Sequence, residues 1–320
     1  MQGSLRTALE LLYHAGATSS VPCELLEQHG ILLLVPHEHK KEAYRQLAAA
    51  EAMKQDFLEV AHMLQGRQIR FVPIKGLLLG QWLYGDYALR GSSDIDLAVP
   101  LESYEEAIRS LTEAGHTHSR SDYQHRTVEV FSCRKNQSTL ELHFALSTAE
   151  LFSGFAAEFW QDQEVVVFEG RAFACLSKEV NLIYLMIHLA RHMEELRAVW
   201  IEDIRRFLMK FGPALDWNRF LDLARKHRLA NVLLLTMTYC NRVFQEFGQD
   251  VRFPQDVVDE IRRRQTLHGR LIYRYLLPRL ERHAMTSWSR RIFSFSLIED
   301  WPERLFLIKE FLRRRLLGKA

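Results

Sequence analysis

The first apolar positions of the chain repeat with the spacing of a helix. Four of them stand at positions i, i+3, i+4 and i+7: Leu5, Ala8, Leu9 and Leu12. This spacing places their side chains on one face of an α-helix, which Gly16 would end. A second, longer helix is predicted over about residues 37–64, where alanine, glutamate, lysine and glutamine are frequent. The pattern therefore predicts a mostly helical region over residues 1–65.

Short β-type segments follow in the next part of the chain. Residues 69–74 are rich in β-forming side chains, and a helical pattern continues from them to about Tyr84. The segment of residues 95–99, closed by Pro100, has the pattern of a buried strand. Residues 101–114 return to helical spacing. Strand and helix thus alternate here, as they do in an α/β core.

Two β-hairpins are predicted further along the chain. The segments 127–131 and 139–144 both alternate between apolar and polar residues, with a polar turn between them. The segments 164–168 and 171–175 are joined by a short turn in the same way. With the preceding strands, these hairpins predict a small α/β core over residues 66–176.

Beyond Ser177 the chain has helical periodicity almost throughout, and Pro213 and Pro254 separate the helices. It contains no internal repeat and no low-complexity linker. The pattern as a whole predicts the α+β class. The expected parts are a helical N-terminal arm, an α/β core and a mostly helical C-terminal domain over residues 177–320.

Composition and charge exclude several classes of protein. Hydrophobic residues make up 48% and charged residues 26% of the 320 residues, values typical of a soluble globular protein. A net charge of +2 argues against a molecule that binds nucleic acid over its whole surface. The four cysteines have no metal-binding spacing, which favours reduced, buried thiols, and neither a signal peptide nor a transmembrane segment is recognisable. We therefore expect a cytoplasmic protein.

A pair of aspartates opens the strand predicted at residues 95–99. Side chains alternate along a strand, so Asp94 and Asp96 point to one face while Ile95 between them points to the core. Two carboxylates held this close repel each other unless a cation neutralises them. Hard oxygen ligands suit Mg²⁺, and we therefore expect a magnesium site at this pair.

Glu141 is the best candidate for a third carboxylate. It lies on a neighbouring predicted strand between Leu140 and Leu142, whose side chains would pack into the core on the opposite face. Its position on the same side of the sheet as Asp94 is a hypothesis. His143 would share the face of Glu141, where it could either form a hydrogen bond to a metal ligand or be an ordinary core histidine.

Lys75-Gly76 stands where a predicted strand ends and a helix begins. Free backbone amides at a helix N-terminus favour anions, glycine permits close approach of a phosphate, and Lys75 adds a positive charge. We therefore predict a nucleotide-binding segment that also includes the loop before the aspartates. In that loop, Arg90 could either neutralise phosphates or brace the loop, and Ser92 and Ser93 are expected to cap and orient the aspartates.

His188 and His192 lie four residues apart and would share one face of a helix. This spacing permits metal binding, but no third ligand follows at the spacing of a zinc site. A buried or inter-domain hydrogen-bonding role is therefore favoured, and Asp203 could be their charge partner. Together with His143, these histidines are candidates for the surroundings of the metal ligands.

Several short motifs follow one another along roughly residues 70–240. The first group comprises Ile74-Lys75-Gly76, Tyr84-Gly85-Asp86 and Arg90-Gly91-Ser92-Ser93-Asp94-Ile95-Asp96-Leu97. The second group comprises Leu140-Glu141-Leu142-His143-Phe144, His188-Leu189-Ala190-Arg191-His192, Asp203 and Asp216-Trp217. Over this range the chain resembles the uncharacterised nucleotidyltransferase family within the polymerase-beta-like superfamily.

This resemblance implies a nucleotidyltransferase core on a small mixed β-sheet, a nucleoside triphosphate and two Mg²⁺ ions, which Mn²⁺ could replace. It implies Asp94, Asp96 and Glu141 as catalytic metal ligands, with Lys75 and Gly76 at the triphosphate. The reaction would move a nucleoside monophosphate to a hydroxyl and release pyrophosphate. The acceptor stays open between a small molecule, a protein side chain and a nucleic-acid end.

Two features keep other functions open. Leu77 follows Gly76 where the wider superfamily has a glycine or serine, so the alternative is a non-catalytic nucleotide- or partner-binding module of the same fold. Basic residues also gather toward the C-terminus, in the runs Arg262-Arg263-Arg264, Arg290-Arg291 and Arg313-Arg314-Arg315. These helices could bind an anionic partner weakly, although such runs are more often solvated helix faces.

Overall fold

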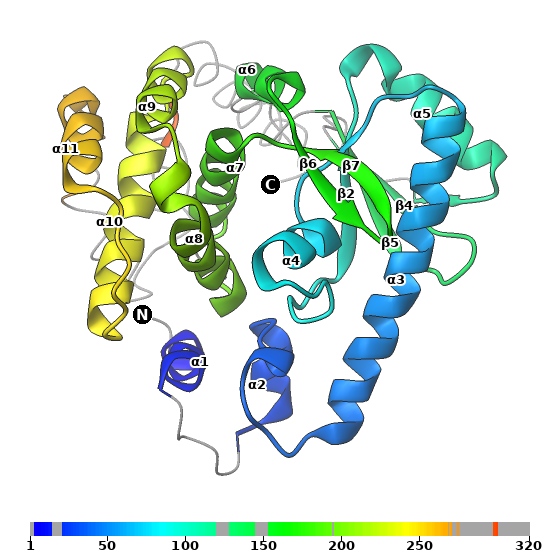
Figure 1. The fold of residues 1–320 in the computed structure, drawn as a ribbon, viewed down its shortest axis with the longest axis horizontal. Helices are drawn as coiled ribbons and strands as arrows, with labels where there is room; N and C mark the ends of the chain where they lie inside the picture. The colour runs from blue at the N-terminus through cyan, green and yellow to red at the C-terminus, as the bar shows by residue number, and fades with distance from the viewer. Residues whose placement is uncertain are drawn as a thin grey trace, which may run out of the picture.

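The computed structural model describes residues 3–14, 21–119, 128–144, 153–193, 195–267, 269–270, 274 and 297–299 (Figure 1). The helices are α1 (Gly3–Tyr13), α2 (Cys23–Gln28), α3 (Lys40–Gly66), α4 (Gly76–Tyr84), α5 (Tyr104–Glu113), α6 (Ser153–Ala156), α7 (Lys178–Arg191), α8 (Ala198–Phe211), α9 (Trp217–Lys226), α10 (Ala230–Glu246) and α11 (Gln255–Arg264). The strands are β1 (Val72–Pro73), β2 (Asp94–Ala98), β3 (Thr117–Ser119), β4 (Val128–Ser132), β5 (Thr139–His143), β6 (Glu164–Phe168) and β7 (Arg171–Cys175). Among these described residues, no helix is both long enough and apolar enough to cross a membrane.

A mixed five-stranded sheet forms the centre of the fold. Its strand order is β1-β2-β5-β4-β3, in which β2 and β5 are parallel and the other neighbours are antiparallel. The turn at Gln137, which has a φ of 60°, joins β4 to β5 as the first predicted hairpin. The second predicted hairpin is a separate two-stranded sheet of β6 and β7. With the helices α7 to α11 that follow, this architecture confirms the predicted α+β class.

Two hydrophobic clusters hold the helices in place. In the first, α3 and α5 pack against the sheet, and Phe57 of α3 contacts Phe168 and Phe173 of the β6–β7 hairpin. In the second, α1 and α2 join the C-terminal helices, and Figure 1 shows α1 below α8 with α2 beside α1. The helical region of residues 1–65 is therefore shared between two cores, because α3 turns its apolar face to the sheet while α1 packs on α8.

The strand predicted over residues 69–74 is shorter in the structure, where β1 contains two residues. The Ile69 amide cannot pair with a neighbouring strand, because it donates a hydrogen bond to the Leu64 carbonyl in the last turn of α3 at 2.9 Å. Pro73 has no amide hydrogen to add to the ladder. Ile74 still donates to the Asp96 carbonyl at 3.2 Å, so the end of β1 stays fixed against the strand of the two aspartates.

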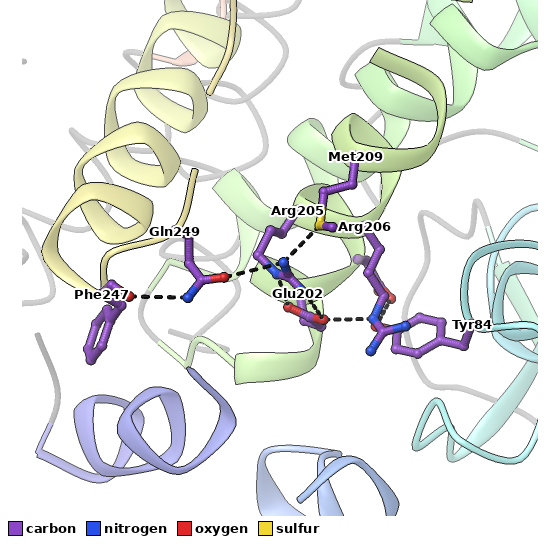
Figure 2. Close-up of polar contacts among 8 residues, drawn as sticks. Tyr84, Glu202, Arg205, Arg206, Met209, Phe247 and Gln249 are labelled. Carbon is purple, nitrogen blue, oxygen red and sulfur yellow. Dashed lines mark hydrogen bonds and ion pairs between the residues drawn. The ribbon is translucent and has the colours of Figure 1, made fainter. Parts of the chain in front are cut away.

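A buried carboxylate on α8 fixes this helix against its neighbours (Figure 2). Glu202, whose side chain is 1% exposed, accepts hydrogen bonds from Arg205 at 2.7 Å and from Arg206 at 2.7 Å. The Arg206 guanidinium lies 4.3 Å from the ring centre of Tyr84 on α4, a cation–π contact. On the other side, Arg205 donates to Gln249 at 3.3 Å, beyond the end of α10. One carboxylate thereby ties α8 to both α4 and α10.

Candidate active site

Asp94 and Asp96 are the first and third residues of strand β2, so their side chains lie on one side of the sheet. Ile95 and Leu97 alternate with them and are buried at 3% and 0% exposure in the cluster beneath α3. Asp96 is buried as well, whereas Asp94 is only partly covered. The predicted alternation therefore holds, and it brings both carboxylates to one place.

Glu141 lies beside Asp96 on the neighbouring strand. In the parallel pairing of β2 with β5, Asp96 is the partner of Glu141, and Ala98 is the partner of His143. Paired residues of adjacent strands point to the same side of a sheet. Ligand atoms of Asp96, Glu141 and His143 accordingly lie within 4.8 Å of one another. The hypothesis that Glu141 shares the side of the aspartates agrees with this register.

Lys75 and Gly76 bring a positive charge and a helix N-terminus to the carboxylates. Lys75 Nζ lies 3.0 Å from Asp96 Oδ1. Gly76 begins α4 with a φ of +69°, a conformation that other residues rarely adopt, and a Cβ there would lie 3.4 Å from the Asp94 carbonyl oxygen. The Ser92 hydroxyl donates to the same carbonyl at 3.2 Å. Ser93, the next residue, is exposed.

Burial and neighbouring charges shift the pKa values of the two aspartates in opposite directions. Burial, followed by the charge of Asp96, raises the pKa of Asp94 to about 6. Burial also acts to raise the pKa of Asp96, but Lys75 and His143 outweigh it and lower that pKa to about 2. Burial acts to lower the pKa of His143, yet its hydrogen bonds to Asp96 and Glu141 raise it overall. Asp96 is therefore ionised at neutral pH, and a bound cation would compete with a proton on Asp94.

These residues fit a hard divalent cation. Asp96 Oδ1 accepts from Lys75 and His143, but Asp96 Oδ2 is buried and has no hydrogen-bond partner within the described residues. A buried polar atom of this kind is costly unless a further partner satisfies it. Carboxylate oxygens are the protein ligands that Mg²⁺ prefers. Asp94, Asp96 and Glu141 therefore supply a suitable donor set on one side of the sheet.

Replacing His143 with glutamine is expected to weaken Mg²⁺ binding by about 10–100-fold, as for other residues that orient a metal ligand. The reason is that His143 Nε2 lies 3.0 Å from Asp96 Oδ1 and 3.4 Å from Glu141 Oε2. Isothermal titration calorimetry with Mg²⁺ and a nucleoside triphosphate measures the change. His118→Gln is the matched control, because His118 contacts Glu129 at 2.6 Å on the far strands of the same sheet. Equal affinities in the two variants would contradict the role of His143.

Arg90 is buried and paired with Asp203 on α8. Its Nε lies 3.1 Å from both carboxylate oxygens of Asp203, and its Nη2 lies 2.9 Å from Oδ2. The Tyr84 hydroxyl donates to Asp203 Oδ1 at 2.8 Å. These contacts match the loop-bracing alternative for Arg90. They also correct the expectation for Asp203, whose partners here are Arg90 and Tyr84 in place of His188 and His192.

A cluster of histidine and tryptophan rings lies where α7 packs against α8. The ring centres of His188 on α7 and of His192, the residue after α7, lie 4.9 and 5.1 Å from that of Trp200 on α8. Burial, followed by the charge of Lys75, lowers the pKa of His188, and burial is the main cause that lowers the pKa of His192 to about 4. His188 Nε2 is buried without a hydrogen-bond partner in the described part of the chain. Both histidines are therefore neutral at pH 7 and line the surroundings of Lys75.

Two members of this group were not found from the sequence: Tyr184 and Trp200. Tyr184 stacks on His188 with ring centres 6.3 Å apart, and burial raises its pKa against the opposing charge of Lys75. A signal for Tyr184 was present, because it precedes His188 by four residues on one helix face. Trp200 gives no such signal, since it lies on a different helix.

The arginine run at the end of α11 is balanced by acids of the same helix. Arg262 pairs with Asp259 at 2.7 Å, Arg264 pairs with Glu260 at 2.6 Å, and Arg263 also pairs with Glu260. Such pairs within one helix are typical of a solvated helix face. The runs at residues 290–291 and 313–315 lie outside the described residues.

Acidic residues on the neighbouring strands β2 and β5 lie next to Lys75-Gly76 at the N-terminus of α4. This arrangement defines a site of the nucleotidyltransferase class. A comparison with protein-family models agrees, because the model of the family described as "Uncharacterised nucleotidyltransferase" matches residues 9–245. The chain belongs to this family, and it is a nucleotidyltransferase. Among curated proteins, none matches the chain.

Several solved structures are similar in part. The antibiotic-resistance factor ANT(2'')-Ia is 16% identical, with 58% of this chain and 96% of that chain covered and a TM-score of 0.40. The lincosamide antibiotic adenylyltransferase LnuA is 13% identical, with 48% and 94% covered and a TM-score of 0.34. An antigenic nucleotidyltransferase-like protein from Paracoccidioides brasiliensis is 15% identical, with 56% and 91% covered and a TM-score of 0.35.

Proposed function

We propose that this nucleotidyltransferase moves a nucleoside monophosphate from a nucleoside triphosphate to a hydroxyl group, with release of pyrophosphate and dependence on Mg²⁺. The observation that supports it best is the placement of three acids. Asp94 and Asp96 on β2 face the same side as Glu141 on β5, and one buried oxygen of Asp96 has no partner within the described residues. Such a set suits a divalent cation better than it suits stability alone.

The three acids have distinct tasks in this proposal. Asp94 and Asp96 would be shared by two Mg²⁺ ions, and Glu141 would be a ligand of one of them. When bound, the two ions lower the pKa of the acceptor hydroxyl and neutralise the departing pyrophosphate, and Mn²⁺ could replace them. His143 holds the Asp96 carboxylate in orientation, since its Nε2 contacts Oδ1 at 3.0 Å.

The basic side of the site binds the phosphates. Lys75 Nζ, which is 3.0 Å from Asp96 Oδ1, can turn from this carboxylate to the β- and γ-phosphates once metal neutralises the acids. The Gly76 amide at the start of α4 adds a donor and the positive end of the helix dipole. Ser92 orients the Asp94 backbone, and Ser93 is exposed next to it for a nucleotide contact. Arg90 braces the loop through Asp203.

The acceptor is a hydroxyl of a small molecule, a protein side chain or a nucleic-acid end. The wall of His188, His192 and Trp200 beside Lys75 offers stacking surfaces and an unpaired ring nitrogen to the nucleotide base or to this acceptor. Neutral histidines at this place do not add to the positive charge that already faces the triphosphate.

Titration of Mg²⁺ and each of the four nucleoside triphosphates into the wild type tests the proposal. Heat of binding and pyrophosphate release are followed together, and Asp94→Ala/Asp96→Ala is the comparison. We expect the wild type to bind one or more triphosphates only with metal and to release pyrophosphate once an acceptor is supplied, water included at a low rate. The double variant should do neither. Identical behaviour of the two proteins would contradict the site.

The alternative function is a non-catalytic nucleotide- or partner-binding module. Leu77 after Gly76 motivates it, because the second residue of α4 then offers no hydroxyl to a phosphate, and Leu77 is buried in the core. Metal-dependent triphosphate binding by the wild type without pyrophosphate release, across a panel of hydroxyl acceptors, would favour this alternative over transfer.

A further inference from the structure

We propose that Cys23, His39 and Glu42 form a transition-metal site, best suited to Zn²⁺, where α2 meets the start of α3. Cys23 is the first residue of α2, His39 immediately precedes α3, and Glu42 lies in the first turn of α3. One ligand atom from each lies within 4.8 Å of the other two. The site is separate from the acids of β2 and β5 and does not depend on the proposed transfer reaction.

The chemistry of these three ligands selects the metal. Thiolate, imidazole and carboxylate are the protein ligands of Zn²⁺, whereas Mg²⁺ and Ca²⁺ take oxygen ligands. Ligand atoms about 2.0–2.3 Å from a tetrahedral Zn²⁺ lie roughly 3.4–3.7 Å from one another. Small side-chain rotations would bring the ligand atoms of Cys23, His39 and Glu42 to this separation from the observed 4.8 Å or less. Three protein ligands leave a fourth position for water.

The imidazole of His39 is held in the orientation that a ligand needs. Its Nε2 lies 2.7 Å from the Val21 carbonyl oxygen, and a carbonyl can only accept, so Nε2 carries the hydrogen. The lone pair of the neutral ring is then on Nδ1, which is left to bind the metal. A carbonyl that fixes the second ring nitrogen is the usual outer partner of a metal-binding histidine. The backbone amide of His39 also donates to His37 Nδ1 at 3.0 Å, which fixes the turn.

Charge around Cys23 favours a cation. The carboxylates of Glu24, Glu27 and Glu42 interact electrostatically with the Cys23 thiol, so negative groups surround the sulfur. Arg45 opposes them, and it pairs with Glu27 at 3.3 Å and with Glu42 at 3.9 Å. The other three cysteines of the chain are buried, whereas Cys23 is partly exposed. The Cys23 side chain itself is buried, so a metal on this sulfur would be largely shielded from solvent.

Metal at this position would stabilise a segment that supports the active-site loop. The chain leaves α2 at Gly30, whose carbonyl accepts from the Gly91 amide at 3.3 Å. A Cβ on Gly91 would come within 2.8 Å of the Gly30 backbone, so the two segments are in close contact. Arg197 further ties this turn to the helical half by donating to the Gln28 carbonyl at 2.8 Å. A metal that joins α2 to α3 would therefore hold the turn at Gly30 in place, and this turn contacts the loop before Asp94.

Cobalt substitution tests the site with a signal that only a sulfur ligand produces. The full chain is treated with a chelator, kept reduced and titrated with Co²⁺, and near-ultraviolet absorption from thiolate-to-cobalt charge transfer is recorded. We expect this absorption in the wild type and its displacement by Zn²⁺, with a rise in the melting temperature on Zn²⁺ addition. Absence of the absorption in the wild type would overturn the proposal. Metal bound by the oxygen ligands of the acidic site gives no such band.

Three variants and a control assign the ligands. Cys23→Ser should lose the charge-transfer absorption, and His39→Gln and Glu42→Gln should weaken Zn²⁺ binding by at least about 10–100-fold, the loss that even an outer partner causes. His62→Gln is the control, because His62 is an exposed histidine on the same helix α3. Absorption that persists in Cys23→Ser, or equal Zn²⁺ affinities for His39→Gln and His62→Gln, would overturn the site.

Discussion

Asp96→Asn is expected to lower the rate of nucleotidyl transfer by about a thousandfold or more and to destabilise the fold at the same time. In the proposed reaction Asp96 would be a ligand of both Mg²⁺ ions, and its loss would remove roughly 4 kcal/mol of transition-state stabilisation, which corresponds to that factor. The structural cost has a separate cause. Asp96 has a fully buried side chain that neutralises Lys75, so the variant leaves a buried ammonium without its counter-charge, at a cost of about 3 kcal/mol or more in the free energy of unfolding.

Glu141→Gln separates these two effects. Glu141 is the register partner of Asp96, but its side chain is 30% exposed. We expect this variant to lose most of its activity with little change in the free energy of unfolding, because water can solvate the altered group. Pyrophosphate release and urea unfolding of both variants are the measurements, and Glu105→Gln on the exposed face of α5 is the control. Full activity in either site variant would refute the assignment of these acids.

The parts of the site that can be predicted from the sequence depend on local rules. Side-chain alternation alone places Asp94 and Asp96 on one face of a strand and Ile95 in the core. The hairpin of β4 and β5 follows from its alternating segments and its turn, and it fixes the face on which Glu141 lies. The glycine at the start of α4 is predicted at a strand-to-helix turn, and its φ of +69° agrees with that interpretation.

The rest of the site depends on contacts between distant segments. No local pattern pairs β2 with β5 in parallel, because β3 and β4 intervene in the chain. Arg90 and Asp203 are 113 residues apart, and Asp203 was wrongly expected beside the histidines. Trp200 joins His188 and His192 only because α7 and α8 pack together. Tertiary packing decides such arrangements. The periodicity of a single sequence indicates local structure and does not show which distant segments pack together.

Asp203→Asn is expected to lower the free energy of unfolding by about 3–5 kcal/mol, because it leaves the Arg90 guanidinium charged in a site where its side chain is 4% exposed. Arg90→Met should cost a similar amount, since Asp203 is then the uncompensated buried charge. The double variant Arg90→Met/Asp203→Asn should be less destabilised than the sum of the two, and this difference is the coupling energy of the pair. Urea unfolding of the four proteins measures it.

An exposed pair elsewhere in the chain provides the matched control for this cycle. Arg67 and Glu113 lie 2.7 Å apart with side chains 40% and 54% exposed, so Glu113→Gln should change stability by about 1 kcal/mol or less. A loss as small as this in Asp203→Asn would show that the buried pair does not hold the loop in place.

Asp203→Asn and a further variant, Arg90→Lys, decide between the two roles of Arg90. If Arg90 braces the loop, Arg90→Lys and Asp203→Asn break one bidentate pair and should lower transfer to a similar extent, because both let the loop before Asp94 shift. Asp203 itself cannot bind a triphosphate, since its charge would repel the phosphates. A raised KM for the nucleoside triphosphate in Arg90→Lys, with an unchanged KM in Asp203→Asn, would therefore contradict bracing and assign Arg90 to the phosphates.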